Sequence, residues 1–379
     1  MPDPLPPLPL PSGITSRYID CTSSAGLTFH ILEAGTPESG TTRPLVLLCH
    51  GFPEIAYSWR HIIPSLASAG YHVVAPDQRG YGRTTGWDTS SFSDVDLNQF
   101  TVTNLVRDLV CLVYALGYRK VRCIIGHDFG AVSSAMAALM RPDLFTASIQ
   151  MSHPHHAPAE PGAANKTDIQ AELATLDPPR KHYKWYNSTA PAAHDWDNPA
   201  QGLEAYLRGY FHLKSGNWAH NTPHPLLAWR AADLAQMPDY YIMPLPLSMP
   251  ATIAKNMHGE DATATESWLP PAALAVYAAE WTRTGFQGGL NWYRAQTSST
   301  PTHARDMLLF AGRGIDVPTC FVSGERDWGN FQQVGAIEAY RESCADFRGV
   351  RLVQGAGHWV QQERPGEVVR EVLAFLGGL

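Results

Sequence analysis

Short apolar runs alternate with helical patterns over the first 150 residues of the chain. Residues 45–49 (Leu-Val-Leu-Leu-Cys) are continuously apolar, which is typical of a strand buried on both faces of a sheet. The other early strands are expected at residues 27–32, 71–75, 121–125 and 146–151, and helices at 57–69, 101–116 and 131–140. Strands that alternate with helices predict an α/β fold with a mostly parallel sheet and helices on both faces.

The pattern changes after Met151. Residues 153–305 are rich in Pro, Trp, Tyr, His and Ala and show no strong strand, with helical patterns near 168–176, 202–212 and 271–284. The alternation then resumes, with strands at 317–323 and 349–353 and helices at 331–344 and 365–376. We therefore expect four segments: an extended N-terminal arm (1–13), a first core segment (14–152), an inserted helical cap (153–305) and a second core segment (306–379).

Composition narrows the class of protein. The net charge is −7, and no run of basic residues forms the stripe that a nucleic-acid partner requires. The proline-rich N-terminus lacks the pattern of a signal peptide, and no apolar stretch reaches the ~18 residues of a membrane span. We expect a cytoplasmic protein with no membrane or nucleic-acid partner, and the sequence leaves open whether it forms a homodimer.

The six cysteines show no metal-binding spacing. Cys49, Cys123 and Cys320 lie in apolar runs that we interpret as buried strands, so reduced core thiols are expected. Neither a metal nor a cofactor is predicted.

The most informative motif is Gly-His-Asp-Phe-Gly at residues 126–130, between a predicted strand and a predicted helix. Two glycines around an outward-pointing residue at such a turn are typical of a nucleophile elbow. The middle residue is Asp128, whose carboxylate attacks carbon directly and needs no base to deprotonate it first. The alternative is an ordinary helix N-cap, for which Asp is also favoured.

Two later residues complete a nucleophile, acid and histidine order. His358 follows the last predicted strand, where an elbow hydrolase carries its base, although a polar loop histidine is the alternative. Asp327 lies between Asp128 and His358 in the chain, as an acid that orients the histidine should. A solvated loop acid is the alternative interpretation of Asp327, and Glu325 is the reserve candidate.

An early loop supplies candidate oxyanion donors. His-Gly-Phe-Pro-Glu at residues 50–54 follows the strand at 45–49. In elbow hydrolases the oxyanion hole uses backbone N–H groups of such a loop and of the residue after the nucleophile. Those residues are Phe52 and Phe129 in this chain.

These motifs together resemble the epoxide hydrolases of the α/β-hydrolase fold, from about residue 15 to the C-terminus. The resemblance implies an α/β-hydrolase core with an inserted cap, and hydrolysis of an epoxide to a vicinal diol. It implies an alkyl ester on Asp128, released by water that His358 activates with Asp327 orienting it.

The resemblance also implies two cap tyrosines that hold the epoxide oxygen. Tyr293, in Gly-Leu-Asn-Trp-Tyr-Arg, matches the second tyrosine of the family. Tyr183 fits the first, with Tyr186 as the alternative. The expected substrate-lining residues are Pro53, Trp185, Tyr186 and Trp359.

Haloalkane and haloacetate dehalogenases share the elbow and histidine motifs. Haloalkane dehalogenases hold halide with a Trp after the nucleophile, and haloacetate dehalogenases carry Arg there. This chain has Phe129, which has no side-chain donor, so an epoxide is favoured. The aromatic cap favours an apolar or aryl epoxide. Two alternatives remain: a haloalkane or haloacetate dehalogenase, or another hydrolase, that uses the same Asp nucleophile, and a non-catalytic small-molecule binding protein on the same fold.

Overall fold

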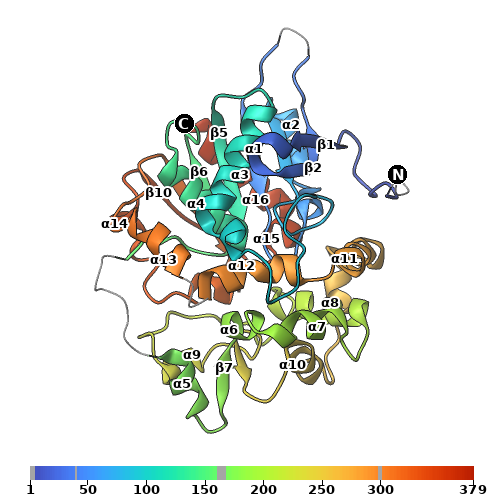
Figure 1. Ribbon diagram of the computed structural model, residues 1–379, viewed down its shortest axis with the longest axis vertical. Coiled ribbons are helices and arrows are strands. Elements are labelled where there is room, and N and C mark those ends of the chain that lie inside the picture. Colours follow the sequence, from blue (N-terminus) through green and yellow to red (C-terminus); the bar gives the residue numbers. More distant parts are fainter. Residues whose placement is uncertain (1–4, 39–40, 160–167, 298–300) are drawn as a thin grey trace.

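One eight-stranded sheet forms the centre of the computed structural model, which describes residues 5–38, 41–159, 168–297 and 301–379 (Figure 1). In pairing order its strands are β1 (Thr15–Cys21), β2 (Leu27–Ala34), β4 (His72–Pro76), β3 (Leu45–Cys49), β5 (Val121–His127), β6 (Ser148–Met151), β9 (Thr319–Gly324) and β10 (Phe347–Val353). β2 pairs antiparallel with β1 and β4, and the pairs from β4 to β10 are parallel. The mostly parallel sheet predicted from the sequence is confirmed.

Helices cover both faces of this sheet. The helical elements around it are α1 (Thr22–Ala25), η1 (Ala56–Trp59), α2 (Ile63–Ser68), η2 (Leu97–Phe100), α3 (Val102–Ala115), α4 (Phe129–Met140), η4 (Trp328–Asn330), α14 (Tyr340–Ser343), α15 (Val360–Glu363) and α16 (Pro365–Gly377). Alternate residues of β3 point to opposite faces, so Leu47 packs in the core beside α3 and α4, and Leu48 in the core beside α2 and α16. This arrangement explains why β3 is apolar at every position.

Two helices predicted from the sequence differ from those in the structure. The helix expected at 57–69 is divided into η1 and α2, because Pro64 in the first turn of α2 has no N–H to continue an earlier helix. The prediction of a helix at 331–344 is wrong, because this segment forms turns and only the short α14. Gly335 takes a φ of 74° there, which a right-handed helix does not permit.

The segment between β6 and β9 is mainly helical, and in Figure 1 most of its helices lie together below the sheet. Its elements are α5 (Ile169–Ala174), β7 (Arg180–His182), α6 (Tyr183–Asn187), α7 (Ala190–Asp197), α8 (Leu203–Lys214), α9 (Ala231–Leu234), β8 (Ile242–Pro244), α10 (Met249–Asn256), η3 (Thr263–Ser267), α11 (Pro271–Thr284), α12 (Gln287–Thr297) and α13 (Pro301–Leu308). α12 contacts both α6 and η2, so it joins these helices to the sheet side of the molecule. The antiparallel pair β7–β8 was not predicted, because three residues are too few for an alternating pattern.

The N-terminal arm and the cap are described only in part. Residues 1–4 of the expected arm, and 160–167 and 298–300 of the expected cap, lie outside the described residues. Residues 5–11 contain neither helix nor strand. The hydroxyl of Tyr57 donates a hydrogen bond to the Pro9 carbonyl over 3.2 Å, which ties this arm to the core.

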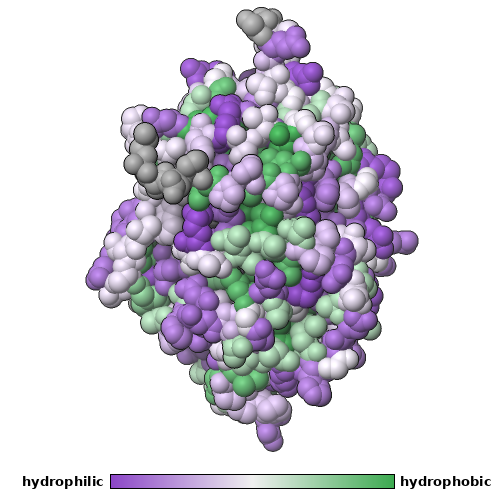
Figure 2. All heavy atoms as spheres, turned by 90° about the vertical axis from the view of Figure 1, so that its right-hand side faces the viewer, coloured by the Kyte–Doolittle hydropathy of each residue, from purple (hydrophilic) through white to green (hydrophobic). Residues whose placement is uncertain are grey.

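The face shown in Figure 2 mixes hydrophilic and hydrophobic residues, with the hydrophobic ones gathered in a broken band down its middle. Within the described residues, no helix has the length and apolar character needed to cross a membrane.

Candidate active site

Asp128 stands at a sharp turn between β5 and α4, with a φ of 52°. Non-glycine residues rarely adopt this left-handed backbone, and it costs on the order of 1–3 kcal/mol. A hydrogen bond from the Asp128 N–H to the Met151 carbonyl, 3.0 Å long, helps to hold the turn. The side chain makes no capping hydrogen bond to α4, so it projects from the strand end instead of closing the helix.

The glycines around this turn are required by close backbone approaches. A Cβ on Gly126 would lie 1.9 Å from the Gly130 carbonyl oxygen. A Cβ on Gly51, in the neighbouring loop, would lie 2.4 Å from the Cβ of Asp128. Real atoms do not approach this closely, so larger residues at either position would displace the carboxylate.

Each carboxylate oxygen of Asp128 has a different neighbour. Oδ1 accepts a hydrogen bond from the backbone N–H of Phe52 over 3.0 Å. Phe129 is the first residue of α4, so its N–H is among the donors that the helix leaves unpaired. Oδ2 lies 3.5 Å from Nε2 of His358. One oxygen is thus held by a backbone donor while the other faces an imidazole.

The imidazole of His358 is fully buried and held from two sides. Its Nδ1 lies 3.1 Å from both carboxylate oxygens of Asp327, while its backbone N–H donates to the Lys214 carbonyl over 2.9 Å. Nε2 has no hydrogen-bond partner among the described residues. Asp327 itself accepts from the Gly329 N–H over 2.6 Å. Glu325, the reserve candidate, is exposed and 3.4 Å from the Gly355 N–H, so the structure does not bring it to His358.

The electrostatics favour ionised carboxylates at both positions. Burial raises the pKa of Asp128, but the close approach and charge of His358, with the charges of Lys214 and His127, outweigh burial and hold that pKa below its ordinary value. Burial likewise raises the pKa of Asp327, and the charge of His358 with the Gly329 N–H lowers it on balance. A nucleophile and an orienting acid both need the charged form.

A buried polar network behind His358 was not predicted from the sequence. His127 lies with Nδ1 2.7 Å from Oε2 of Glu54 and Nε2 2.7 Å from the His358 carbonyl oxygen. Gln361 and Gln362 donate to the same carboxylate over 2.7–3.1 Å. Both His127 and Glu54 stand inside motifs singled out for other reasons, and only their contact in space reveals this network.

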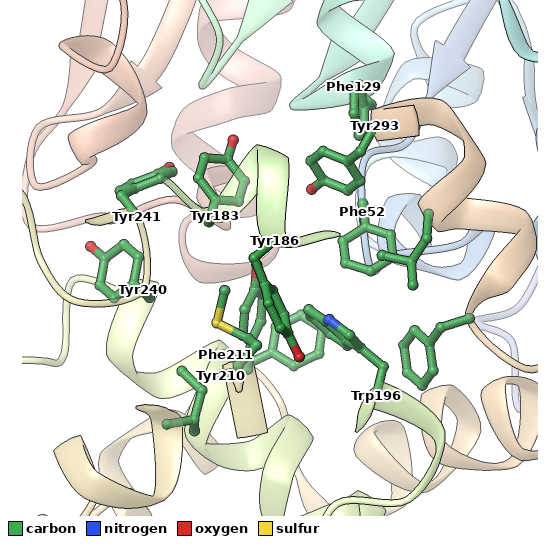
Figure 3. Close-up of a cluster of buried hydrophobic side chains, with 14 of the residues drawn as sticks. Phe52, Phe129, Tyr183, Tyr186, Trp196, Tyr210, Phe211, Tyr240, Tyr241 and Tyr293 are labelled. Atoms are coloured by element: carbon green, nitrogen blue, oxygen red, sulfur yellow. The ribbon is translucent and has the colours of Figure 1, made fainter. Parts of the chain in front are cut away.

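Two cap tyrosines approach each other across the site. The rings of Tyr183 and Tyr293 are 5.8 Å apart, and Figure 3 shows the Tyr293 hydroxyl on the side that faces Tyr183. Tyr293 packs against Phe52 and Phe129, at 5.4 and 4.5 Å between ring centroids. The Tyr183 hydroxyl donates to Gln332 over 3.1 Å. Burial, together with charged and polar neighbours that include Asp128, raises the pKa of both phenols well above the ordinary value, so both remain proton donors.

Tyr186, the alternative first tyrosine, is engaged elsewhere. Its hydroxyl donates to Oδ2 of Asp195 over 2.7 Å, within the cap. Trp185 packs on His182, at 5.1 Å, and is not brought to Asp128 by any contact of the described residues. The ring arrangement in Figure 3 therefore favours Tyr183 over Tyr186 as the partner of Tyr293.

Pro53 and Trp359, the other residues expected to line the substrate site, both lie close to residues of the site or the cap. The Phe52–Pro53 peptide is cis, and the Pro53 carbonyl accepts from the Trp281 indole N–H over 2.8 Å. Trp359 is fully buried with its ring 4.6 Å from that of His358, and its indole N–H donates to the Phe211 carbonyl over 2.9 Å. Trp359 thus supports the histidine from behind.

Comparison with known proteins agrees with this geometry. The family model described as alpha/beta hydrolase fold matches residues 44–365, so the chain belongs to that family. Within it, the chain is 34% identical over 368 residues to epoxide hydrolase A of Mycobacterium tuberculosis, covering 96% of this chain and 98% of that protein. Epoxide hydrolase B of the same bacterium is 32% identical over 380 residues, with the same coverage. The chain is a member of the epoxide hydrolases of this fold.

Solved structures give the same result. An epoxide hydrolase from an endophytic Streptomyces superimposes with a TM-score of 0.77 at 28% identity, over 97% of this chain and 96% of that one. Epoxide hydrolase A from Mycobacterium thermoresistibile gives a TM-score of 0.71 at 33% identity, over 97% and 99% of the two chains.

Proposed function

We propose that this protein hydrolyses an epoxide to a vicinal diol through a covalent ester on Asp128. The observation that carries the proposal is the unequal environment of the two Asp128 oxygens: Oδ1 is held by the Phe52 N–H, and Oδ2 faces His358. Tyr183 and Tyr293 supply two neighbouring phenols at the same site. The named relatives are epoxide hydrolases.

The first step opens the ring. The epoxide lies between the carboxylate and the two phenols, with its oxygen accepting hydrogen bonds from Tyr183 and Tyr293. Oδ2 of Asp128 attacks one ring carbon, the carbon–oxygen bond breaks, and one phenol gives its proton to the leaving oxygen. High phenol pKa values keep both groups protonated until the alkoxide forms, so the donors act mainly as charge develops.

The second step releases the product. His358 takes a proton from water through Nε2, and the hydroxide attacks the ester carbon of Asp128. The negative charge forms on Oδ1, where the N–H groups of Phe52 and Phe129 stabilise it. Breaking the bond from the ester carbon to Oδ2 expels the diol oxygen, which takes the proton from His358. The water oxygen stays on Asp128 as part of a carboxylic acid, and the proton of this acid returns to the phenolate left by ring opening, so both groups regain their starting forms. Asp327 stabilises the imidazolium between these transfers.

Two experiments test the scheme. The variant His358→Gln should keep ring opening and lose ester hydrolysis, so intact-mass analysis should show an adduct on Asp128, whereas Asp128→Ala should form neither adduct nor diol. In a single turnover of the unsubstituted protein in ¹⁸O water, the new diol oxygen should come from Asp128 and be unlabelled. A labelled first-turnover diol, or normal turnover by the His358 variant without an adduct, would show that the scheme is wrong.

The proposal also covers the kind of epoxide that the protein hydrolyses. Buried aromatic side chains surround the tyrosine pair (Figure 3), among them Phe52, Trp196 and Tyr210, and they support an apolar or aryl epoxide. Phe129 argues against a dehalogenase, which halide release from chloroalkanes or haloacetates would reveal. A ligand that binds and returns unchanged would favour a binding protein. The cytoplasmic location stays a prediction, and the sequence leaves the homodimer open.

A further inference from the structure

One segment of the cap lies directly against the loop that carries His358. It comprises residues 214–221, the last residue of α8 and the turns after it, and we call it the cap anchor. The His358 N–H donates to the Lys214 carbonyl over 2.9 Å. A Cβ on Gly216 would lie 2.1 Å from the Gly355 carbonyl oxygen, so the cap and the core pack backbone on backbone at this point.

Glu363 ties the cap anchor to both neighbours of His358. Oε2 of Glu363 accepts hydrogen bonds from the Gly216 N–H over 2.8 Å and from the Gly357 N–H over 2.9 Å. Oε1 accepts from the Trp359 N–H over 3.0 Å. A carboxylate suits three donors, because both of its oxygens are acceptors. This side chain therefore fixes the loop on either side of the histidine and joins it to the cap.

Arg326, the residue before Asp327, makes a second link to the cap anchor. Its guanidinium donates to three backbone carbonyls of the anchor: Nη1 to Gly216 over 2.7 Å, Nη2 to Ala219 over 3.0 Å and Nε to Asn221 over 3.1 Å. The donors of a guanidinium are fixed in one plane, so three such bonds define where the anchor lies relative to the loop after β9.

The two links meet at the pair of residues that must act together. Asp327 follows β9 and His358 follows β10, so the pair comes from two separate loops. Nδ1 of His358 lies 3.1 Å from both Asp327 oxygens. A misplacement of about 1 Å in a catalytic group can cost about 100-fold in rate. Contacts that hold both loops to one segment therefore act on catalysis without touching the substrate.

We propose, on the basis of the proposed function, that Arg326 and Glu363 are positioning residues that act through the cap anchor. Together they hold Asp327 and His358 in the geometry that ester hydrolysis requires. The cap thus contributes more to the site than its two tyrosines, because the segment after α8 sets the relative position of the base and of the acid that orients it.

Ring opening does not use this pair, and its own groups are held by other contacts. Asp128 is fixed at the turn after β5, where its N–H donates to the Met151 carbonyl. α12, which carries Tyr293, is joined to the core by the Trp292 indole N–H, which donates to the Arg79 carbonyl over 2.9 Å. Weakening the links to the cap anchor should therefore slow the second step and spare the first.

Arg326→Met and Glu363→Gln test the two links. Methionine has no donor for the three carbonyls, and glutamine replaces one acceptor oxygen with an NH₂ group that faces a backbone N–H. In each variant, hydrolysis of the ester on Asp128 should slow by about 10-fold or more while ring opening keeps its rate. The ester should therefore accumulate on Asp128 during turnover, and rapid-quench intact-mass analysis measures it.

Two matched controls make similar contacts away from the cap anchor. Arg43, which precedes β3 at the other end of the sheet, donates to the Ala67 carbonyl over 3.1 Å. Glu172 accepts from the Ala231 N–H over 3.3 Å inside the cap. Arg43→Met and Glu172→Gln should show no more ester than the unsubstituted protein. A residue that serves stability alone slows both steps or neither, so the ester level separates positioning from folding.

The proposal is overturned if a folded Arg326→Met or Glu363→Gln enzyme shows no extra ester, or if both steps slow equally. Arg326→Lys is a milder variant, because one ammonium cannot reach all three carbonyls. If none of these three variants folds, as urea unfolding would show, the links serve the fold itself and the proposal is wrong. If His358→Gln traps no ester and the unsubstituted protein forms no diol, the proposed function fails instead, so the two failures are distinguishable.

Discussion

The backbone N–H of Phe52 donates to Oδ1 of Asp128 over 3.0 Å, although the two residues lie 76 positions apart. The contact exists because β3 and β5 are parallel neighbours whose carboxyl ends meet at one edge of the sheet. Gly51 lets the loop after β3 pass directly over the carboxylate. The hydrogen bond therefore depends on a glycine that has no chemical role itself.

Gly51→Ala is predicted to lower kcat by about 100-fold, because the new methyl group would displace Phe52 from Asp128 and remove an oxyanion donor. Gly366→Ala is the matched control, since a Cβ at Gly366 meets nothing within 4 Å. Steady-state kinetics, with thermal unfolding to check the fold, measure both. Equal kcat values for the two variants would contradict the role given to the Phe52 N–H.

The core of the site was predictable from the sequence for a topological reason. Asp128, Asp327 and His358 each follow a strand, and parallel strands bring their carboxyl ends to one edge whatever their separation in the chain. The elbow glycines were equally visible, since they mark a turn that only small residues fit. Local pattern and strand direction together sufficed for these three residues.

The surrounding features could not be predicted in this way. Glu54 and His127 are in contact although they lie 73 positions apart in the chain. The ammonium of Lys214 packs among four rings from separate segments, those of Tyr210, Tyr240, Tyr241 and Trp359. Tyr183 and Tyr186 lie three positions apart in one motif, and they are distinguished by the ring contact of Tyr183 with Tyr293 and by the hydrogen bond of Tyr186 to Asp195. No periodicity encodes such contacts.

Tyr183→Phe and Tyr293→Phe are each predicted to lower kcat/KM by about 100-fold, because each removes one donor to the epoxide oxygen. Tyr186→Phe loses the hydrogen bond to Asp195, which costs about 1 kcal/mol of stability, and should keep kcat/KM close to the unsubstituted value. Diol formation and urea unfolding measure the two effects. A large activity loss in the Tyr186 variant would instead make it the first tyrosine.

Asp327→Asn is predicted to slow ester hydrolysis by about 10³-fold or more, because the amide cannot stabilise the imidazolium of His358. Ring opening needs no base, so the variant should accumulate the adduct on Asp128. Glu325→Gln is the control, since Glu325 is exposed and 3.4 Å from the Gly355 N–H. Rapid-quench mass analysis follows the adduct. If the adduct accumulated in the Glu325 variant and not in the Asp327 variant, Glu325 would be the acid that orients His358.

Glu54→Gln is predicted to lower the free energy of unfolding by about 2–3 kcal/mol near neutral pH, because it removes the carboxylate that pairs with buried His127. Burial raises the pKa of Glu54, but His127 outweighs burial and lowers it on balance. A lowered carboxyl pKa stabilises the fold fully above the unfolded value of about 4.3, and this contribution is lost as the pH falls through the lower folded value.

The pKa of His127, the partner of Glu54, is shifted in the opposite direction. Burial lowers the pKa of His127, but Glu54 raises it on balance, so its stabilisation is complete below the unfolded value of about 6.5 and is lost as the pH rises through the folded value. The cost of Glu54→Gln should therefore be largest between about pH 4.3 and 6.5 and shrink on both sides. Urea unfolding of this variant and of an exposed control, Glu338→Gln, across pH 4 to 9 measures the difference. If the loss of unfolding free energy in Glu54→Gln were the same at every pH, the loss would come from poorer packing of the amide alone, and the pair of Glu54 and His127 would carry no charge.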